Sequence, residues 1–144
     1  MLKSALHQYL ATCTGLVALV PAARIYRGRR PAGSPLPAIT YWRVSEVDED
    51  HQEGATGLVQ ARYQFDIWAA ADSAAEAIRV ELRGALHGLS HTTIGTGAAT
   101  TAVQGVRLQN TVDSQDWPAD GSDVHVRQIS VDALVWYETT VPTF

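Results

Sequence analysis

The chain contains a single cysteine, Cys13, among its 144 residues. An intrachain disulfide needs two cysteines, and so does a zinc site built on paired thiolates, so the sequence excludes both. Cys13 falls on the apolar side of a predicted helix. We therefore interpret it as a small buried residue and not as a reactive thiol.

Long apolar runs are also missing. Near the N-terminus the longest is Leu16–Val20, far below the ~20 residues that a membrane-spanning helix needs. Lys3 alone makes a weak basic region for a signal peptide. The sequence therefore predicts no membrane association and a soluble protein of a reducing compartment.

Basic residues are not in excess, because 11 lysines and arginines stand against 15 aspartates and glutamates, for a formal net charge of −4. A protein of this charge is not attracted to phosphate backbones, so tight DNA binding is disfavoured. The one local basic cluster has only Tyr26 as an aromatic neighbour and is a weak nucleic-acid signal. It consists of Arg24, Arg27, Arg29 and Arg30. We expect these arginines to form salt bridges with an acidic neighbour.

Motifs for catalysis are absent as well. The five histidines show no H-E-x-x-H spacing, Gly95–Gly97 lacks the lysine of a P-loop, and no serine sits in a G-x-S-x-G turn. One acidic cluster has ligands for a divalent cation, but its spacing fits no EF-hand, so we interpret it as a solvated hairpin tip. It comprises Asp48, Glu49, Asp50, His51 and Glu53. The sequence predicts no catalytic residue, no cofactor and no metal.

The composition, 46% hydrophobic and 18% charged, is that of one ordered domain spanning residues 1–144. Two segments carry the apolar stripe of a helix packed on one side. The first stripe is Leu2, Leu6, Tyr9, Leu10 and Cys13, and Gly15 is expected to stop that helix. The second follows a capping box at Ser73–Glu76 and contains Ile78, Leu82, Ala85, Leu86 and Leu89.

Alternating apolar residues predict four strands. They lie within Pro37–Ser45, Val59–Ile67, Val106–Val112 and Val124–Tyr137. We expect loops at Glu46–Gly57 and at the turn-rich Ser114–Asp123, and a weakly ordered connection over Ser90–Ala102, where Gly, Thr, Ser and Ala dominate.

The predicted fold is therefore α+β in the order α-β-β-α-β-β, a two-layer sandwich of an antiparallel four-stranded sheet with two helices on one face. Trp42, Trp68, Leu134 and Trp136 fall out of phase with the core-facing positions. They form either a second small core with edge contacts or a subunit interface on the face that no helix covers.

Several segments, taken in order, resemble the tail terminator or tail completion proteins of long-tailed phages. An amphipathic N-terminal helix precedes Arg-Ile-Tyr-x-Gly-Arg at 24–29 and Leu-Pro-Ala-Ile-Thr-Tyr at 36–41. Gly-Leu-Val-Gln-Ala-Arg-Tyr-Gln-Phe-Asp-Ile-Trp-Ala follows at 57–69. The helix end Leu-Arg-Gly-Ala-Leu-His-Gly at 82–88 and the strands at 103–108 and 131–140 continue the likeness. Nearly the whole chain is covered.

The resemblance implies a structural virion protein without enzymatic activity. Proteins of this family cap the tail tube at the head-proximal end, usually as a hexameric ring, stop tube polymerisation and form the head-tail joining surface. The implied partners are copies of this chain, the tail tube protein and a head-closure or connector protein, while DNA passes through the lumen without specific binding. The implied location is the virion, after assembly in the host cytoplasm.

Loops at opposite ends of the sheet are the expected contact elements of such a ring. A ring would also let the basic cluster meet the acidic Glu46–Glu53 loop of the next copy. The candidate interface residues are Arg24, Arg27, Arg29, Arg30, Trp42, Asp48, Glu49, Asp50, Trp68, Trp117 and Trp136.

Two alternatives remain open from the sequence. One is another neck or minor tail component, in an infectious phage, a gene transfer agent or a tail-derived bacteriocin. The other is a small enzyme or ligand-binding domain that uses the uncovered sheet face as a pocket, with Tyr63, Trp42 and Trp136 as walls.

Overall fold

The structure, a computed structural model, describes residues 2–31, 33–51, 54–116 and 126–138. Its helices are α1 (Leu2–Thr12), α2 (Thr14–Leu19) and α3 (Asp72–His87), with short 3-10 helices η1 (Ala22–Arg24) and η2 (Gly97–Ala99). Its strands are β1 (Ile25–Arg27), β2 (Ala38–His51), β3 (Gly54–Ala69), β4 (Thr92–Ile94), β5 (Thr101–Asp116) and β6 (Val126–Glu138).

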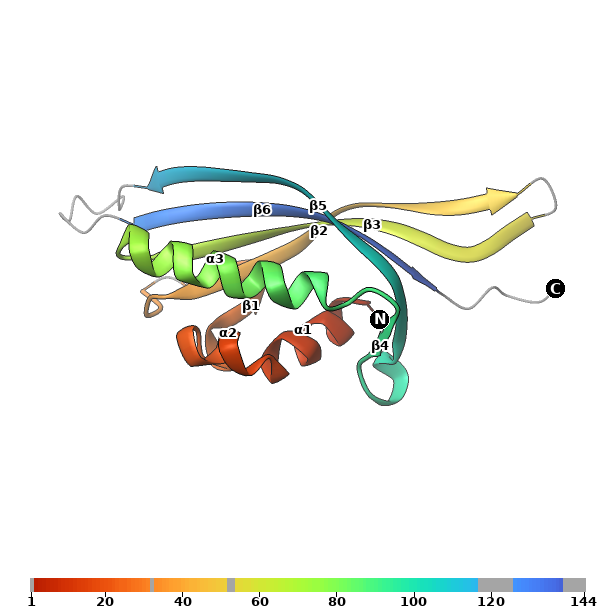
Figure 1. The fold of residues 1–144 in the computed structure, drawn as a ribbon, viewed down its shortest axis with the longest axis horizontal. Coiled ribbons are helices and arrows are strands. Elements are labelled where there is room, and N and C mark those ends of the chain that lie inside the picture. The colour runs from red at the N-terminus through yellow and green to blue at the C-terminus, as the bar shows by residue number, and fades with distance from the viewer. Residues whose placement is uncertain (1, 32, 52–53, 117–125, 139–144) are drawn as a thin grey trace.

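The strands form one mixed sheet in the order β1-β2-β3-β6-β5-β4. β1 runs parallel to β2, and every other neighbouring pair is antiparallel. The sheet is curled, with β5 bending round toward β4 (Figure 1). The prediction of a four-stranded antiparallel sheet with two helices is therefore wrong. The two missed strands are three residues long, too short to show a period-2 pattern.

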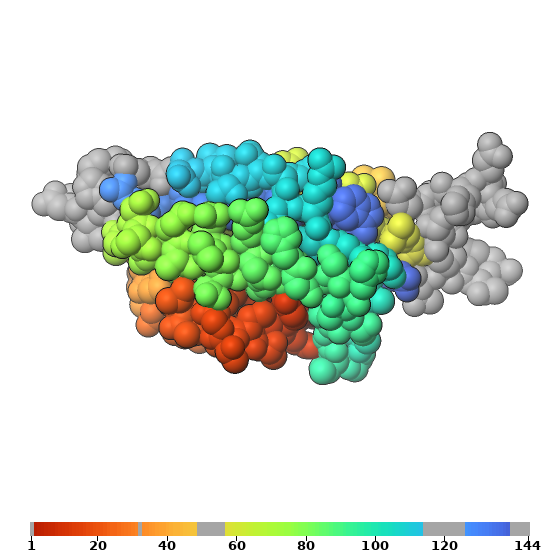
Figure 2. All heavy atoms as spheres, viewed as in Figure 1, coloured from red at the N-terminus to blue at the C-terminus, as the bar shows by residue number. Residues whose placement is uncertain are grey.

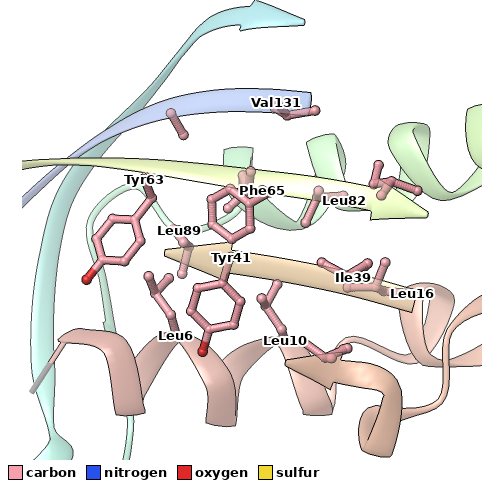
Figure 3. Close-up of a cluster of buried hydrophobic side chains, with 14 of the residues drawn as sticks. Leu6, Leu10, Leu16, Ile39, Tyr41, Tyr63, Phe65, Leu82, Leu89 and Val131 are labelled. Atoms are coloured by element: carbon pink, nitrogen blue, oxygen red, sulfur yellow. The ribbon is translucent and has the colours of Figure 1, made fainter. Parts of the chain in front are cut away.

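All three α-helices pack on the same face of this sheet (Figure 1). Alternation in β2 and β3 turns Tyr41, Tyr63 and Phe65 toward the helices, where each is at most 1% exposed. The rings of Tyr41 and Phe65 stack with centroids 5.5 Å apart, and Leu6 and Leu10 of α1 pack below them (Figure 3). This helix face holds the core of the domain.

The helix stripes are as predicted in α1 and α3, but the helix ends are not. Gly15 does not stop the first helix, since it lies inside α2. The carboxylate at the end of the exposed Glu81 side chain in α3 lies against Gly15, at the place where a Cβ on residue 15 would stand. α3 begins after Ala71 without a side-chain cap, and Glu76 pairs with Arg79 in place of closing a capping box.

Two of the predicted irregular segments are regular. Residues 46–51 and 54–57 continue β2 and β3 as a hairpin. Glu46, Val47 and Asp48 are exposed there, so burial imposes no apolar alternation that would predict a strand. The connection over 90–102 contains β4 and η2, and the Thr96 N–H donates to Oε1 of Gln8 in α1 at 2.8 Å. That contact fixes the connection to the first helix.

Candidate functional site

The face of the sheet opposite the helices, here called the open face, carries the tryptophans singled out from the sequence. Trp42 lies opposite Gln64, Trp68 opposite Gln128, and Trp136 opposite Gln60. Strand alternation places them, together with Leu134, on the open face, and their role in a subunit interface remains a prediction. Trp42 is 36% exposed and the others are partly buried.

These aromatic residues do not form a second core. Polar side chains lie between them on the open face, and the register places Arg62 and Gln64 between Trp136 and Trp68 along the sheet. Tyr63, predicted as a wall of a pocket on this face, is fully buried on the helix side. Because strand alternation separates it from Trp42 and Trp136, the predicted three-walled pocket is absent from the described residues.

A hydrogen-bonded network crosses the open face from strand to strand. Asp66 is only 3% exposed and accepts from Ser130 Oγ at 2.6 Å and from Gln64 Nε2 at 3.0 Å. Arg62 donates to Asp132 Oδ2 at 2.8 Å. The bonds of Ser130 to Asp66 and of Arg62 to Asp132 join β3 to β6, whereas the Gln64–Asp66 bond lies within β3. The two cross-strand bonds help to hold the strands in register.

Most arginines of the basic cluster interact with other residues of the same chain, which the sequence did not predict. Arg24 donates to the Leu36 carbonyl at 3.3 Å, and Arg27 donates to Ser4 Oγ at 3.1 Å. The Arg30 guanidinium lies 5.3 Å from the centroid of the Trp68 ring, within cation–π range. The structure thus brings together two of the predicted interface residues, Arg30 and Trp68. A salt bridge of this cluster to an acidic neighbour remains a prediction.

The far half of the β2–β3 hairpin, residues 44–51 and 54–57, is here called the hairpin arm. It extends past the ends of the helices (Figure 1), and β3 pairs with β6 only from Leu58 onward. Val44 and Val47 are 44% and 58% exposed on it. Asp48, which lies opposite Val59, is also exposed, and Glu49 and Asp50 follow in β2. The acidic cluster therefore lies on a projecting strand.

One arm residue is tied back to the domain. Glu46 accepts a short hydrogen bond from the Tyr137 hydroxyl and pairs with Arg43 at 3.5 Å. Burial, followed by the bond to Glu46, raises the pKa of Tyr137. The tyrosine therefore stays a neutral donor at physiological pH and anchors the root of the arm.

Sequence reasoning missed a groove between α3 and β5, here called the α3–β5 groove. It has a volume of about 250 Å³ and is lined by Arg79, Arg83, Leu108, Gln109, Asn110, Thr111 and Val131. Figure 2 shows α3 and β5 meeting along this side of the molecule. A bulge between Leu108 and Asn110 breaks the β5 ladder there. Two arginines four residues apart on the polar side of a helix were the only sequence signal.

The described part of the chain has neither a cluster of metal ligands nor a membrane-spanning helix. Within it, no three histidine, cysteine, aspartate or glutamate side chains gather as metal ligands, and no helix is long and apolar enough to cross a membrane. Cys13 is partly buried, and burial raises the pKa of its thiol. Trp117 and most of the predicted hairpin tip at 114–123 lie outside the described residues.

Residues 4–138 match the family described as tail completion protein gp17. The chain belongs to this family. Its members are structural proteins of the virion, so the chain is a structural component of a phage-type tail, as the sequence resemblance predicted. No curated protein sequence matches it.

Solved structures share the fold of this tail completion protein. A chain from the virion of a native gene transfer agent particle is 17% identical, with a TM-score of 0.72, over 96% of this chain and 95% of its own. A second solved chain is 15% identical, with a TM-score of 0.51, over 98% and 95%. At these identities the likeness concerns the arrangement of helices and strands.

Proposed function

We propose that this tail completion protein closes the head-proximal end of the tail tube as a ring of six copies. In that position it stops tube polymerisation and presents the surface on which the head-closure or connector protein docks. The observation that carries the proposal is the family match over residues 4–138. The full-length likeness to a chain of a gene transfer agent virion supports it.

The edges of the sheet support a head-to-tail ring. β1 covers only Ile39–Tyr41 of β2, and β4 covers only Thr101–Val103 of β5. From Trp42 on one side and Gly105 on the other, the described residues supply no further strand partner. The two free edges lie on opposite sides of the sheet, and contact between unlike surfaces of identical subunits generates a closed ring when the rotation closes.

DNA would pass through the lumen of such a ring without specific binding. A chain with a formal net charge of −4 gives the ring no general attraction for phosphates. Three arginines of the basic cluster are engaged with their own chain, as described above, and for the exposed Arg29 the described residues supply no ion pair.

The test is the absolute mass of the purified protein by light scattering on a sizing column over a concentration series, with negative-stain images. Six-fold rings, alone or on tube ends, are expected. Some joining proteins close only on their partner, so the same measurement is made with tail tube protein present. Shortened or capped tubes are expected, and tube growth that the protein leaves unchanged would end the proposal.

The competing assignment to another neck or minor tail component makes a different prediction. A terminator gene should lie between the head-closure genes and the gene of the major tail protein. A protein that bound a different virion component and left tube length unchanged would be assigned to that component.

A further inference from the structure

Among the described residues, nothing pairs with the hairpin arm on either outer edge, and it exposes apolar side chains. Beyond Leu58 it is a two-stranded ribbon, and such a ribbon is marginally stable alone in water. Val44 and Val47 are among the large apolar side chains that the chain exposes. An uncovered strand edge of this length invites pairing with another chain, so the arm has the features of a docking element.

The α3–β5 groove has the complementary charge. Arg79 is bonded to Glu76 at 2.9 Å and also lies near Asp113. Arg83 is exposed, and the described residues give it no ion pair. A free guanidinium beside polar groups favours a carboxylate, which it binds through charge-assisted hydrogen bonds.

The groove also borders a free strand edge. Its β5 residues, from Leu108 to Thr111, belong to the stretch of β5 that no described strand covers on its outer side. An acidic segment in extended conformation would satisfy both features at once. Its backbone would pair with β5, and its carboxylate would reach Arg83.

The direction and the faces of the strands fit a second copy of this chain. Three antiparallel steps separate β2 from β5, so the two strands run in opposite directions. A like-oriented second copy therefore offers β2 to β5 as an antiparallel partner, the pairing used by the rest of this sheet. Asp48 lies opposite Val59, a residue of the helix face, and Arg83 of α3 is on that same face. Continuing the sheet would keep both on one side.

We propose that the hairpin arm of one copy docks on the α3–β5 groove of the next copy, with Asp48 facing Arg83. This inference rests on the proposed ring and deepens it, because it names the surfaces that join its subunits. The contact unites opposite edges of the sheet and is therefore head-to-tail, as ring closure requires. It gives the acidic strand a partner other than the basic cluster, three of whose arginines are already engaged.

A charge swap on the full-length protein tests this contact. Asp48→Lys and Arg83→Glu are each expected to raise the protein concentration at half-assembly about tenfold, because each places like charges across the interface. The double variant restores opposite charges and is expected to assemble near the wild-type concentration. Lys3→Glu makes the same charge change as Arg83→Glu at an exposed position of α1 and should leave assembly unchanged. Unfolding curves of every variant verify that the domain is folded.

The outcomes separate this inference from the proposed function. Single variants that assemble like wild type, or a double variant that does not recover, would overturn the docking while wild-type rings on tube ends keep the function. Asp48→Lys rings that form normally but no longer cap tubes would assign the arm to the tube protein and also overturn it. A wild-type protein that neither assembles nor caps tubes removes both.

Discussion

The two faces of the sheet are stabilised in different ways, although the same strands form both. On the helix face, Tyr41, Tyr63 and Phe65 are each at most 1% exposed. Burial of apolar surface there therefore stabilises the single chain. On the open face, Asp66 and Arg62 are held by hydrogen bonds, while Trp42 remains 36% exposed. One face is completed by packing within one copy, and the other leaves the Trp42 ring partly exposed.

The largest expected effect breaks the helix face. Phe65→Ala removes a ring that is 0% exposed and should lower the free energy of unfolding by about 3–5 kcal/mol, through lost transfer energy and a residual cavity. Urea unfolding at a concentration below assembly measures it. The matched control is Trp42→Ala on the open face of the adjacent strand, expected to change the same quantity by less than about 1 kcal/mol. Equal losses for the two would contradict the distinction between the faces.

A smaller effect tests whether the open face also contributes to folding. Asp66→Ala leaves Ser130 Oγ and Gln64 Nε2 without their acceptor and should cost about 1–3 kcal/mol of unfolding free energy, the usual penalty for a broken buried hydrogen bond. Asp66→Asn keeps an acceptor oxygen and should cost less. Urea unfolding of wild type and both variants measures the two losses of unfolding free energy. If Asp66→Ala unfolded like wild type, the network would have no role in holding β3 to β6.

The long elements of the fold could be predicted because burial imposes periodicity on them. Every second residue of β3 from Val59 to Ile67 is buried, and the helix stripes follow the same logic with a period of 3.6. The short edge strands could not be found this way. β1 lies in a segment dominated by Arg, Pro and Gly, and it exists because its backbone pairs with Ile39–Tyr41 of β2, a contact that no local pattern encodes.

The candidate site likewise has features that one strand alone could predict and features that depend on elements distant in sequence. The tryptophans were placed on the open face by alternation alone, because alternation is a property of one strand. The α3–β5 groove depends on a bulge in β5 and on a helix that is distant in sequence. Arg79 and Arg83, four residues apart on the polar side of a helix, were the only sequence signal, and without those neighbours they do not define a groove. The partners of Arg24 and Arg27, a carbonyl and a hydroxyl, were equally invisible, because charge alone suggests a carboxylate.

The smallest expected effect is a pH dependence of stability that arises from His7, a partly buried residue at the edge of the helix-face core. The His7 ring stacks on Tyr41, with centroids 6.5 Å apart, and its Nδ1 is buried without a hydrogen-bond partner among the described residues. Burial, and then the positive charge of Arg27, lower the pKa of His7 below its ordinary value of 6.5. The neutral ring is therefore the form that the folded state prefers.

The sign of the pH dependence follows from this shift. Because the folded pKa is depressed, the unfolded chain binds the proton more readily, and stability falls as the pH drops from 6.5 through the folded pKa of His7. His7 is only partly buried, so solvent screens part of this effect and the loss should be only a few tenths of a kcal/mol. His7→Gln cannot take up this proton, so the difference between its unfolding free energy and that of wild type should change between about pH 7.5 and pH 5, with wild type losing more. Urea unfolding of both proteins across that range measures the difference. A constant difference would show that the His7 ring is solvated in the folded state and is not part of the core beside Tyr41.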